Sequence, residues 1–221
     1  MEVKLISRPD MGAVSLCEHA AAMCTQSDQP ARALRGALRS GHDSVAEHAV
    51  FTFEIHGVSR VLLAQLTRHR IASFSVMSQR YVNQSGQGCI MPPSINADPD
   101  ARDLYDDAVH CIGTIYNKLI ELGMPQEDAR YILASGTTTD LIMTMNAREL
   151  AHFFSLRCCN RAQWEIREMA DKMLSILSAE FPELFGTAGP GCVRNMCPEK
   201  RPCGHPRRAD EWRQTNCESM R

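Results

Sequence analysis

A dense group of hydrogen-bond donors follows a largely apolar run in this sequence. Residues 68–81 contain three arginines, one histidine and three serines, and they follow the largely apolar run of residues 61–66 in the sequence. Arginine offers five N–H donors in a planar fork that matches phosphate, and loop serines add hydroxyl groups. The segment therefore predicts an anion-binding site, most simply one for a phosphorylated small molecule.

A second segment, residues 145–157, combines cationic side chains with a helical pattern. Arg148 and His152 are four residues apart and would share one face of a helix, and Arg157 would lie at the helix end. Apolar residues between them would supply the buried side. On this pattern alone, a solvated stripe on an amphipathic helix explains the charges equally well.

Two shorter segments admit structural interpretations. In residues 41–48, Ser44 and Glu47 have the spacing of a capping box, although a ligand contact there is equally open. Residues 127–133 begin with the acidic residues that are typical of a helix start. His42 and His48 do not have the spacing of a regular metal motif, and no carboxylate pair completes one.

The order of the donors is more specific than their density. Arg68-His69-Arg70, then Ser73, Ser78 and Arg80, resembles the signature of flavin-dependent thymidylate synthases, the ThyX family. Segments 41–48 and 145–157 resemble two further motifs of that family, so the resemblance covers roughly residues 1–185. At Val76 the chain departs from the many members that carry a polar residue, and only the backbone there can hydrogen-bond a ligand.

The resemblance implies an FAD cofactor and a dUMP substrate, and it assigns residues to each. The implied FAD contacts are Ser44, Arg68, His69, Arg70, Val76, Asn146, Ala147, Arg148 and His152. The implied dUMP contacts are Gln65, Leu66, Thr67, Arg68, Val76, Met77, Ser78, Gln79, Arg80, Arg130 and Arg157. Within the second group, residues 77–80 would hold the phosphate, and Arg130 would come from a neighbouring subunit of a homotetramer.

The reaction that the resemblance implies is the reductive methylation of dUMP to dTMP. NADPH would reduce the flavin, and methylenetetrahydrofolate would donate the one-carbon unit. Arg157 is the implied catalytic residue, because a guanidinium that keeps its proton stabilises negative charge on the uracil ring as an oxyanion hole does. Ser78 has no obvious base beside it and is assigned to phosphate binding rather than to nucleophilic attack.

The elements that would position these residues indicate an α+β fold. Alternating Phe51, Phe53 and Ile55 predict a half-buried strand, and residues 3–7 and 137–145 predict two more. Helices are expected over residues 11–39 with a break near 27–30, and over 59–70, 100–122, 125–133, 147–156 and 161–180. We expect these helices to pack on a mixed or antiparallel sheet in a catalytic domain of residues 1–185, followed by a poorly regular tail over 186–221.

The bulk composition bounds the class of protein. With 221 residues and 44% hydrophobic content, the chain is long enough for one domain with a sizeable core. A net charge of -2 argues against a general nucleic-acid binder. The sequence lacks an apolar run of bilayer length and a signal-peptide pattern, so we expect a cytoplasmic protein with free thiols and no membrane partner.

The tail concentrates cysteine and histidine without a strong metal motif. Cys192, Cys197, Cys203, His205 and Cys217 are separated by gaps that lack the paired C-x-x-C knuckles of zinc sites. We therefore expect no bound metal.

Two other functions remain open on the sequence. A flavoprotein oxidoreductase without methyl transfer is one, and Val76 favours it slightly. A nucleic-acid-binding protein is the other, using residues 68–80 and the basic tail, but only 6% of the residues are aromatic and available for base stacking. A dUMP-dependent reoxidation of reduced flavin would favour the synthase over the oxidoreductase. A steep salt dependence of oligonucleotide affinity would favour the nucleic-acid-binding protein.

Overall fold

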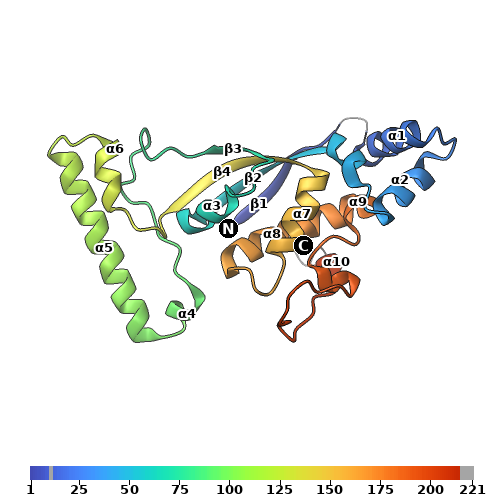
Figure 1. The fold of residues 1–221 in the computed structure, drawn as a ribbon. Coiled ribbons are helices and arrows are strands. Elements are labelled where there is room, and N and C mark those ends of the chain that lie inside the picture. Colours follow the sequence, from blue (N-terminus) through green and yellow to red (C-terminus); the bar gives the residue numbers. More distant parts are fainter. Residues whose placement is uncertain (10–11, 215–221) are drawn as a thin grey trace. The chain divides into compact units, whose positions relative to one another are not determined.

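The computed structural model describes residues 1–9 and 12–214, and it contains an antiparallel sheet. Its strands are β1 (Glu2–Ser7), β2 (Val50–Ser59), β3 (Ser73–Val76) and β4 (Thr138–Asn146). They are hydrogen-bonded in the order β1-β2-β4-β3 (Figure 1). The α+β class and three expected strands are confirmed, whereas β3 is a strand that the sequence pattern did not predict.

Helices occupy most of the remaining regular structure. The α-helices are α1 (Ala13–Thr25), α2 (Pro30–Arg39), α3 (Arg60–Leu66), α4 (Pro93–Asn96), α5 (Pro99–Glu121), α6 (Gln126–Ala129), α7 (Ala147–Arg157), α8 (Trp164–Glu180), α9 (Pro182–Phe185) and α10 (Glu211–Gln214). Three short 3₁₀ helices are η1 (Asp43–His48), η2 (Arg130–Ile132) and η3 (Gly191–Arg194). Asp98 accepts a hydrogen bond from the Ala101 N–H and so caps the long helix α5, which Pro99 begins.

The chain divides into two compact units. Unit 1 comprises Met1–Glu2, Ile55–Arg68 and Ser75–Leu141, and unit 2 comprises Val3–Glu54, His69–Phe74 and the chain from Ile142 onward. Strands β2 and β4 each contribute residues to both units. We describe the candidate site in each unit separately.

An aromatic cluster forms the centre of unit 2. Phe51 of β2 makes edge-to-face contacts with Phe181 and Phe185, at ring-centroid distances of 5.2 and 5.6 Å. Phe153 and Phe154 of α7 continue the cluster, and all these side chains except Phe181 are at most 1% exposed. Edge-to-face pairs add to the free energy of apolar burial, so this cluster anchors α7 and α9 firmly.

Helix α3 is shorter than expected: it ends at Leu66, whereas the sequence pattern predicts a helix through residue 70. Ser59 caps its first turn by accepting a hydrogen bond from the Leu62 N–H. Residues 68–70 lie beyond the helix in an irregular segment, and His69 turns into the protein interior. The helical pattern was wrong here because burial of His69 outweighs the propensity of arginine for a helix.

The expected capping box in residues 41–48 is also wrong. Ser44 lies inside η1, whose N-cap is His42, and the helix has no side-chain cap. Glu47 instead pairs with Arg148 of α7. A long-range ion pair has replaced the local cap that the spacing predicts.

The described part of the tail has little regular structure, but it is packed. Within residues 186–214 only η3 and α10 are helical. Trp212 is 3% exposed, and its ring lies against Gly189, where a Cβ atom would come within 3.1 Å of it. Gly189 also has φ +121°, which glycine adopts readily. Cys217 lies outside the described residues, and no described helix has the length and hydropathy of a membrane span.

Candidate active site

A buried histidine organises the candidate site in unit 2. His69 is 6% exposed and packs edge-to-face on Phe153, with ring centroids 5.0 Å apart. Its Nδ1 lies 3.3 Å from Glu149 Oε1, and its Nε2 lies 3.1 Å from Arg157 Nε. Both partners belong to α7, so one imidazole ties the Arg-His-Arg segment to this helix.

These contacts fix the protonation state of His69. A guanidinium nitrogen can only donate, so Nε2 must accept from Arg157 and the ring proton must reside on Nδ1, which donates to Glu149. Burial lowers the pKa of His69 below its usual value, and Arg157 and His152 act in the same direction against the opposing effect of Glu149. The ring is therefore neutral near pH 7, and its contact with Glu149 is a hydrogen bond rather than an ion pair.

The arginines on either side of His69 are exposed. Among the residues that the structure describes, neither Arg68 nor Arg70 has an ion-pair or hydrogen-bond partner. Each therefore keeps a solvated guanidinium with all its donors available. A pair of such cations at one loop is suited to an anionic ligand.

The start of α7 is joined to the segment before β2. The Ala147 N–H donates to the Ala49 carbonyl at 2.8 Å, and Asn146 caps α7 by accepting from the Glu149 N–H. Arg148 then pairs with Asp43 at 3.0 Å and with Glu47, both in η1. Exposed Ser44 lies in the same 3₁₀ helix, so α7 and η1 bring four of the predicted FAD contacts together.

His152 lies one helical turn after Arg148 on α7. Its ring centroid is 6.2 Å from that of His69, and its side chain is exposed. Unit 2 thus gathers His69, His152 and Arg157 along α7, an arrangement that helical spacing within residues 145–157 did not predict for His69.

In unit 1, one glutamate contacts two of the arginines that were predicted to bind dUMP. Arg80 Nη2 lies 2.8 Å from Glu127 Oε2, and Arg80 Nε donates to the same oxygen at 2.9 Å. Arg130 Nε donates to the backbone carbonyl of Glu127 at 3.0 Å. Arg80 also lies over the ring of Tyr81, 5.5 Å from its centroid. Sequence spacing alone did not predict that Arg80 and Arg130, which are far apart in the chain, would both contact Glu127.

A third arginine supports the loop that carries Met77. Arg60 Nη2 donates to the Met77 carbonyl at 2.7 Å, and the Met77 N–H donates to the Asp140 carbonyl at 2.9 Å. Burial, and then repulsion from Arg130, lower the pKa of Arg60. Its Nε is buried and has no hydrogen-bond partner. Unit 1 therefore holds three guanidiniums in linked positions: Arg80 and Arg130 both contact Glu127, and Arg60 is close enough to Arg130 for their charges to repel.

The other predicted contacts differ in exposure. Leu66 is fully buried, so only its backbone is able to reach a ligand, whereas Thr67 is exposed. The partly buried members are Gln65, Val76, Met77, Ser78 and Gln79. The sequence reading missed Glu149, Glu127 and Arg60 as partners of the predicted residues. No local signal marks these partners, because the contacts of Glu149 with His69, Glu127 with Arg80 and Arg60 with Met77 all depend on tertiary structure.

The cysteines in the described part of the chain are free thiols, and no His, Cys, Asp and Glu residues there form a cluster suited to a metal ion. Burial raises the pKa of Cys158 well above its usual value, and Asp171 raises it further. Cys158 is therefore a neutral, buried thiol rather than a nucleophile.

Comparison with known proteins places this geometry in a family. Residues 4–183 match the family model described as "Thymidylate synthase complementing protein". A protein of Geobacter sulfurreducens named "Flavin-dependent thymidylate synthase" is 50% identical over 161 residues, which cover 72% of this chain and 69% of that protein. Proteins of the same name from Nitratidesulfovibrio vulgaris and Sulfolobus acidocaldarius are each 46% identical, over 171 and 162 residues. These alignments cover 73% and 72% of this chain, and 70% and 62% of the respective relatives.

The matched span includes every residue assigned above to FAD or dUMP, and it ends before the tail. The match to the family model and this level of identity lead to one conclusion. The chain belongs to the family of flavin-dependent thymidylate synthases.

Proposed function

We propose that this enzyme converts dUMP to dTMP, with methylenetetrahydrofolate as one-carbon donor and NADPH as reductant of the flavin. The chain is a flavin-dependent thymidylate synthase, and its cofactor is FAD. The observation that carries the proposal is the neutral His69, which is held between Glu149 and Arg157. The arginines before and after it have no hydrogen-bond or ion-pair partner in the described part of the chain. This arrangement suits a site that needs fixed donors and receives an anionic cofactor and substrate.

The residues present fit FAD. Its diphosphate requires cations and neutral donors, and Arg68 and Arg70 have exposed guanidiniums that no residue within 1–9 or 12–214 engages in a hydrogen bond or ion pair. Ser44, Asn146, Ala147, Arg148 and His152 lie at η1 and along α7, where they would complete the cofactor contacts. When bound, FAD supplies the hydride and one-carbon transfer chemistry, and the protein supplies binding, orientation and electrostatics.

For dUMP, the charges of unit 1 support a phosphate contact. Arg80 and Arg130 contact Glu127, and Arg60 contacts the Met77 carbonyl, so these contacts involve three cations and one carboxylate. A phosphate dianion would relieve the repulsion between Arg60 and Arg130. We assign residues 77–80 and Arg130 to the phosphate and nucleoside, together with Gln65, Leu66, Thr67 and Arg68 on the preceding helix and turn.

Arg157 is the proposed catalytic residue. Its Nε is bound to His69, which fixes the plane of the guanidinium before substrate arrives. A guanidinium cannot lose its proton in a protein, so it would stabilise negative charge that develops on the uracil ring without taking part in proton transfer. His69 cannot take the Arg157 proton, and its role is to orient the donor.

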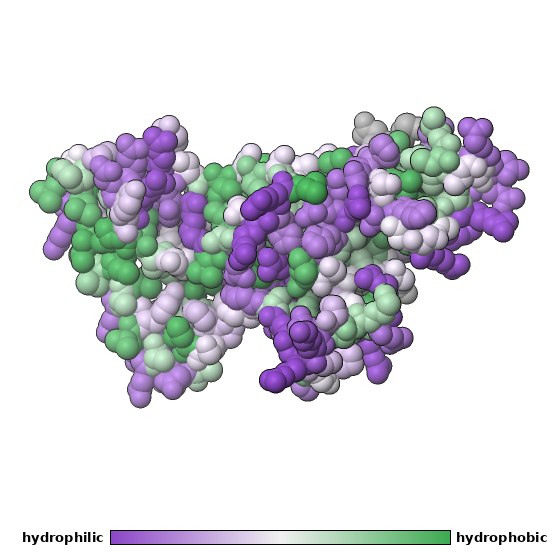
Figure 2. Space-filling model, in the orientation of Figure 1, coloured by the Kyte–Doolittle hydropathy of each residue, from purple (hydrophilic) through white to green (hydrophobic). Residues whose placement is uncertain are grey.

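We further propose a homotetramer whose active sites are shared between subunits. Helix α5 buries only Tyr116 within unit 1, whereas Leu104, Ile115 and Leu122 are 73%, 44% and 74% exposed. Together with exposed Ala108 and Cys111, they recur at spacings of three, four and seven residues and form one apolar stripe. Figure 2 shows hydrophobic residues gathered over this helix. A stripe of this kind matches a helix–helix interface with another copy.

The overall proposal is tested by the visible spectrum of the purified enzyme, followed anaerobically. The oxidised flavin absorption should bleach with NADPH, and dUMP with methylenetetrahydrofolate should then restore it with formation of dTMP. Flavin reduction without dTMP would contradict the proposal and support an oxidoreductase that has lost methyl transfer.

Arg157→Ala should retain FAD and its reduction by NADPH but lose most dTMP formation. Removal of a preorganised charge-stabilising donor costs about 10²- to 10³-fold in turnover. The assay is dTMP formation at saturating dUMP, with flavin content measured on the same sample. Arg35→Ala, an exposed arginine on α2, is the control and should be unchanged. Near-normal turnover in Arg157→Ala would refute the assigned role.

Arg80→Ala should chiefly weaken dUMP binding. A charged hydrogen bond to phosphate contributes about 1.5–3 kcal/mol, so the dissociation constant should rise by about 10- to 100-fold. Calorimetric titration with dUMP measures it, and Arg102→Ala on the exposed surface of α5 is the matched control. An unchanged dissociation constant would show that Arg80 serves only its ion pair with Glu127.

Leu104→Glu combined with Leu122→Glu should break the assembly. Charges on both ends of the apolar stripe would have to be buried without partners, which costs several kcal/mol per interface. Light scattering after size-exclusion chromatography should show smaller species, whereas Asn117→Glu, an exposed position off the stripe, should leave the mass unchanged. A tetramer that persists with both charges would place the interface elsewhere.

A further inference from the structure

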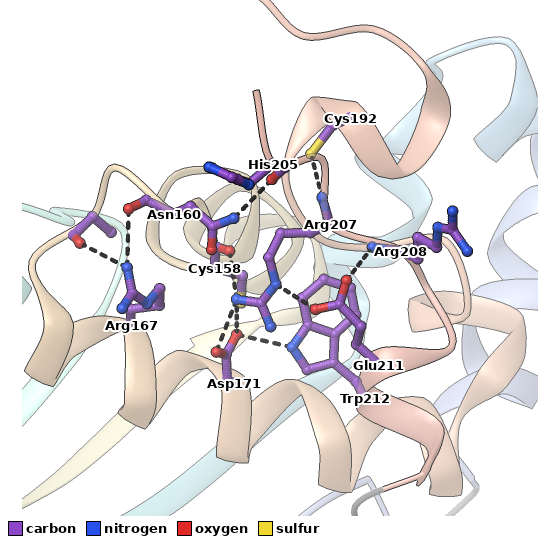
Figure 3. Close-up of polar contacts among 11 residues, drawn as sticks. Cys158, Asn160, Arg167, Asp171, Cys192, His205, Arg207, Arg208, Glu211 and Trp212 are labelled. Atoms are coloured by element: carbon purple, nitrogen blue, oxygen red, sulfur yellow. Dashed lines mark hydrogen bonds and ion pairs between the residues drawn. The ribbon is translucent and has the colours of Figure 1, made fainter. Parts of the chain in front are cut away.

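The tail makes a compact contact with α8 that the family span does not include. The match to the family model ends at residue 183, and residues 186–214 follow it. Helix α10 lies against α8 within unit 2 (Figure 1). Figure 3 shows Arg207 and Trp212 of the tail converging on Asp171 of α8. We call Asp171, Arg207, Glu211 and Trp212 the tail clamp.

Arg207 is the centre of the tail clamp. Its Nη1 lies 3.0 Å from Asp171 Oδ2, and its Nε donates to Glu211 Oε2 at 2.6 Å. Its guanidinium carbon lies 4.8 Å from the centroid of the Trp212 ring. The Arg207 side chain is only 14% exposed, so these partners must compensate a substantially desolvated charge.

Trp212 secures the same contact from the other side. Its Nε1 donates to Asp171 Oδ1 at 2.8 Å, and its carbonyl accepts from Ser175 Oγ at 2.8 Å. Asp171 therefore receives donors from Arg207 and Trp212 at once. The Cys158 side chain also hydrogen-bonds to Asp171, so this carboxylate joins the tail to the end of α7.

Arg207 also reaches the end of α7. Its Nη1 donates to the Cys158 carbonyl at 3.2 Å (Figure 3). Cys158 is the C-cap of α7, and carbonyls in the last turn of a helix have no intrahelical partner. A guanidinium at this position satisfies one of them and is favoured by the helix dipole. The residue immediately before Cys158 is Arg157, whose Nε is bound to His69.

The connection between α7 and α8 has further contacts with the tail. Asn160 Nδ2 donates to the His205 carbonyl at 2.8 Å, and Arg161 pairs with Glu199 at 3.2 Å. Arg167 of α8 donates to the Asn160 carbonyl at 2.9 Å. The backbone that follows Arg157 is thus held by the tail on one side and by α8 on the other.

We propose that Arg207 is a positioning residue that fixes the Cys158 carbonyl, and through it the end of α7 and the guanidinium of Arg157. This inference rests on the proposed catalytic role of Arg157. Arg207 acts through the backbone: its Nη1 contacts both Asp171 and the Cys158 carbonyl, while its Nε is held by Glu211. A lysine would not replace it, since its one nitrogen would be drawn to the Asp171 and Glu211 carboxylates and away from the neutral Cys158 carbonyl.

The test compares Arg207→Ala and Arg207→Lys with Arg208→Ala, each alone and combined with Arg157→Ala. Arg208 is the matched control, because its exposed side chain points away from the tail clamp in Figure 3. Flavin content and Tm report folding of each variant. Arg207→Lys keeps the positive charge beside Asp171. It provides a second variant for the case in which Arg207→Ala does not fold.

The first readout is independent of catalysis. Arg157 is one of the groups that lower the pKa of His69, which also faces Glu149 and His152. If loss of Arg207 lets Arg157 move away, the pKa of His69 should rise, as measured by NMR titration of histidine-labelled protein and assigned with His69→Gln. In the Arg157→Ala background, the same substitution at Arg207 should have no further effect. An unchanged His69 titration in folded Arg207→Ala, or in Arg207→Lys, would overturn the proposal.

The second readout is dUMP affinity by calorimetry. Arg207→Ala should weaken binding about fivefold when Arg157 is present and less than about twofold when it is absent, because groups that act through one contact are non-additive. Equal losses in both backgrounds would mean general destabilisation and would refute positioning. If the wild-type enzyme makes no dTMP, the proposed function fails, while the His69 titration still decides whether Arg207 positions Arg157.

Discussion

The burial of one neutral imidazole sets the arrangement of the candidate site. His69 enters the interior, and Glu149 and Arg157 satisfy its two ring nitrogens. The cost of desolvating a charged imidazole keeps the ring neutral, and only a neutral ring is able to accept from Arg157. A protonated His69 would break this contact and repel the guanidinium. The position of the proposed catalytic arginine therefore depends on the protonation state of a side chain that does not itself take part in the chemistry.

The same burial explains the neighbouring arginines. His69 points inward, whereas Arg68 and Arg70 on either side of it are exposed. Had α3 continued through residue 70, successive side chains would have been spread around the helix instead. Because α3 ends at Leu66, the segment after it has a buried His69 and two exposed cations, Arg68 and Arg70. The buried side chain holds the segment in place, and the two cations are available to bind an anion.

Local pattern predicted three of the four strands and most helices, because alternating Phe51, Phe53 and Ile55 and the acidic start of α6 are properties of adjacent residues. The errors occurred where tertiary contacts outweigh local preference. Glu47 pairs with Arg148 rather than capping η1, and the contact of Glu127 with Arg80 joins residues that no spacing rule connects.

The tail shows even more clearly that local sequence pattern does not predict tertiary contacts. Its composition predicts irregular structure, and residues 186–214 are mostly irregular, yet Trp212 is nearly as buried as the aromatic cluster of unit 2. Periodicity carries no information about a segment whose contacts are made by single side chains. The pair of Arg207 with Asp171 depends on a fold that has already formed α8, so the tail adds its contacts to an existing framework. The tail reaches the backbone beside Arg157 at the Cys158 carbonyl, and it contacts the connection between α7 and α8 at Asn160 and Arg161. A segment outside the family span would in this way tune a residue inside it without sharing its chemistry.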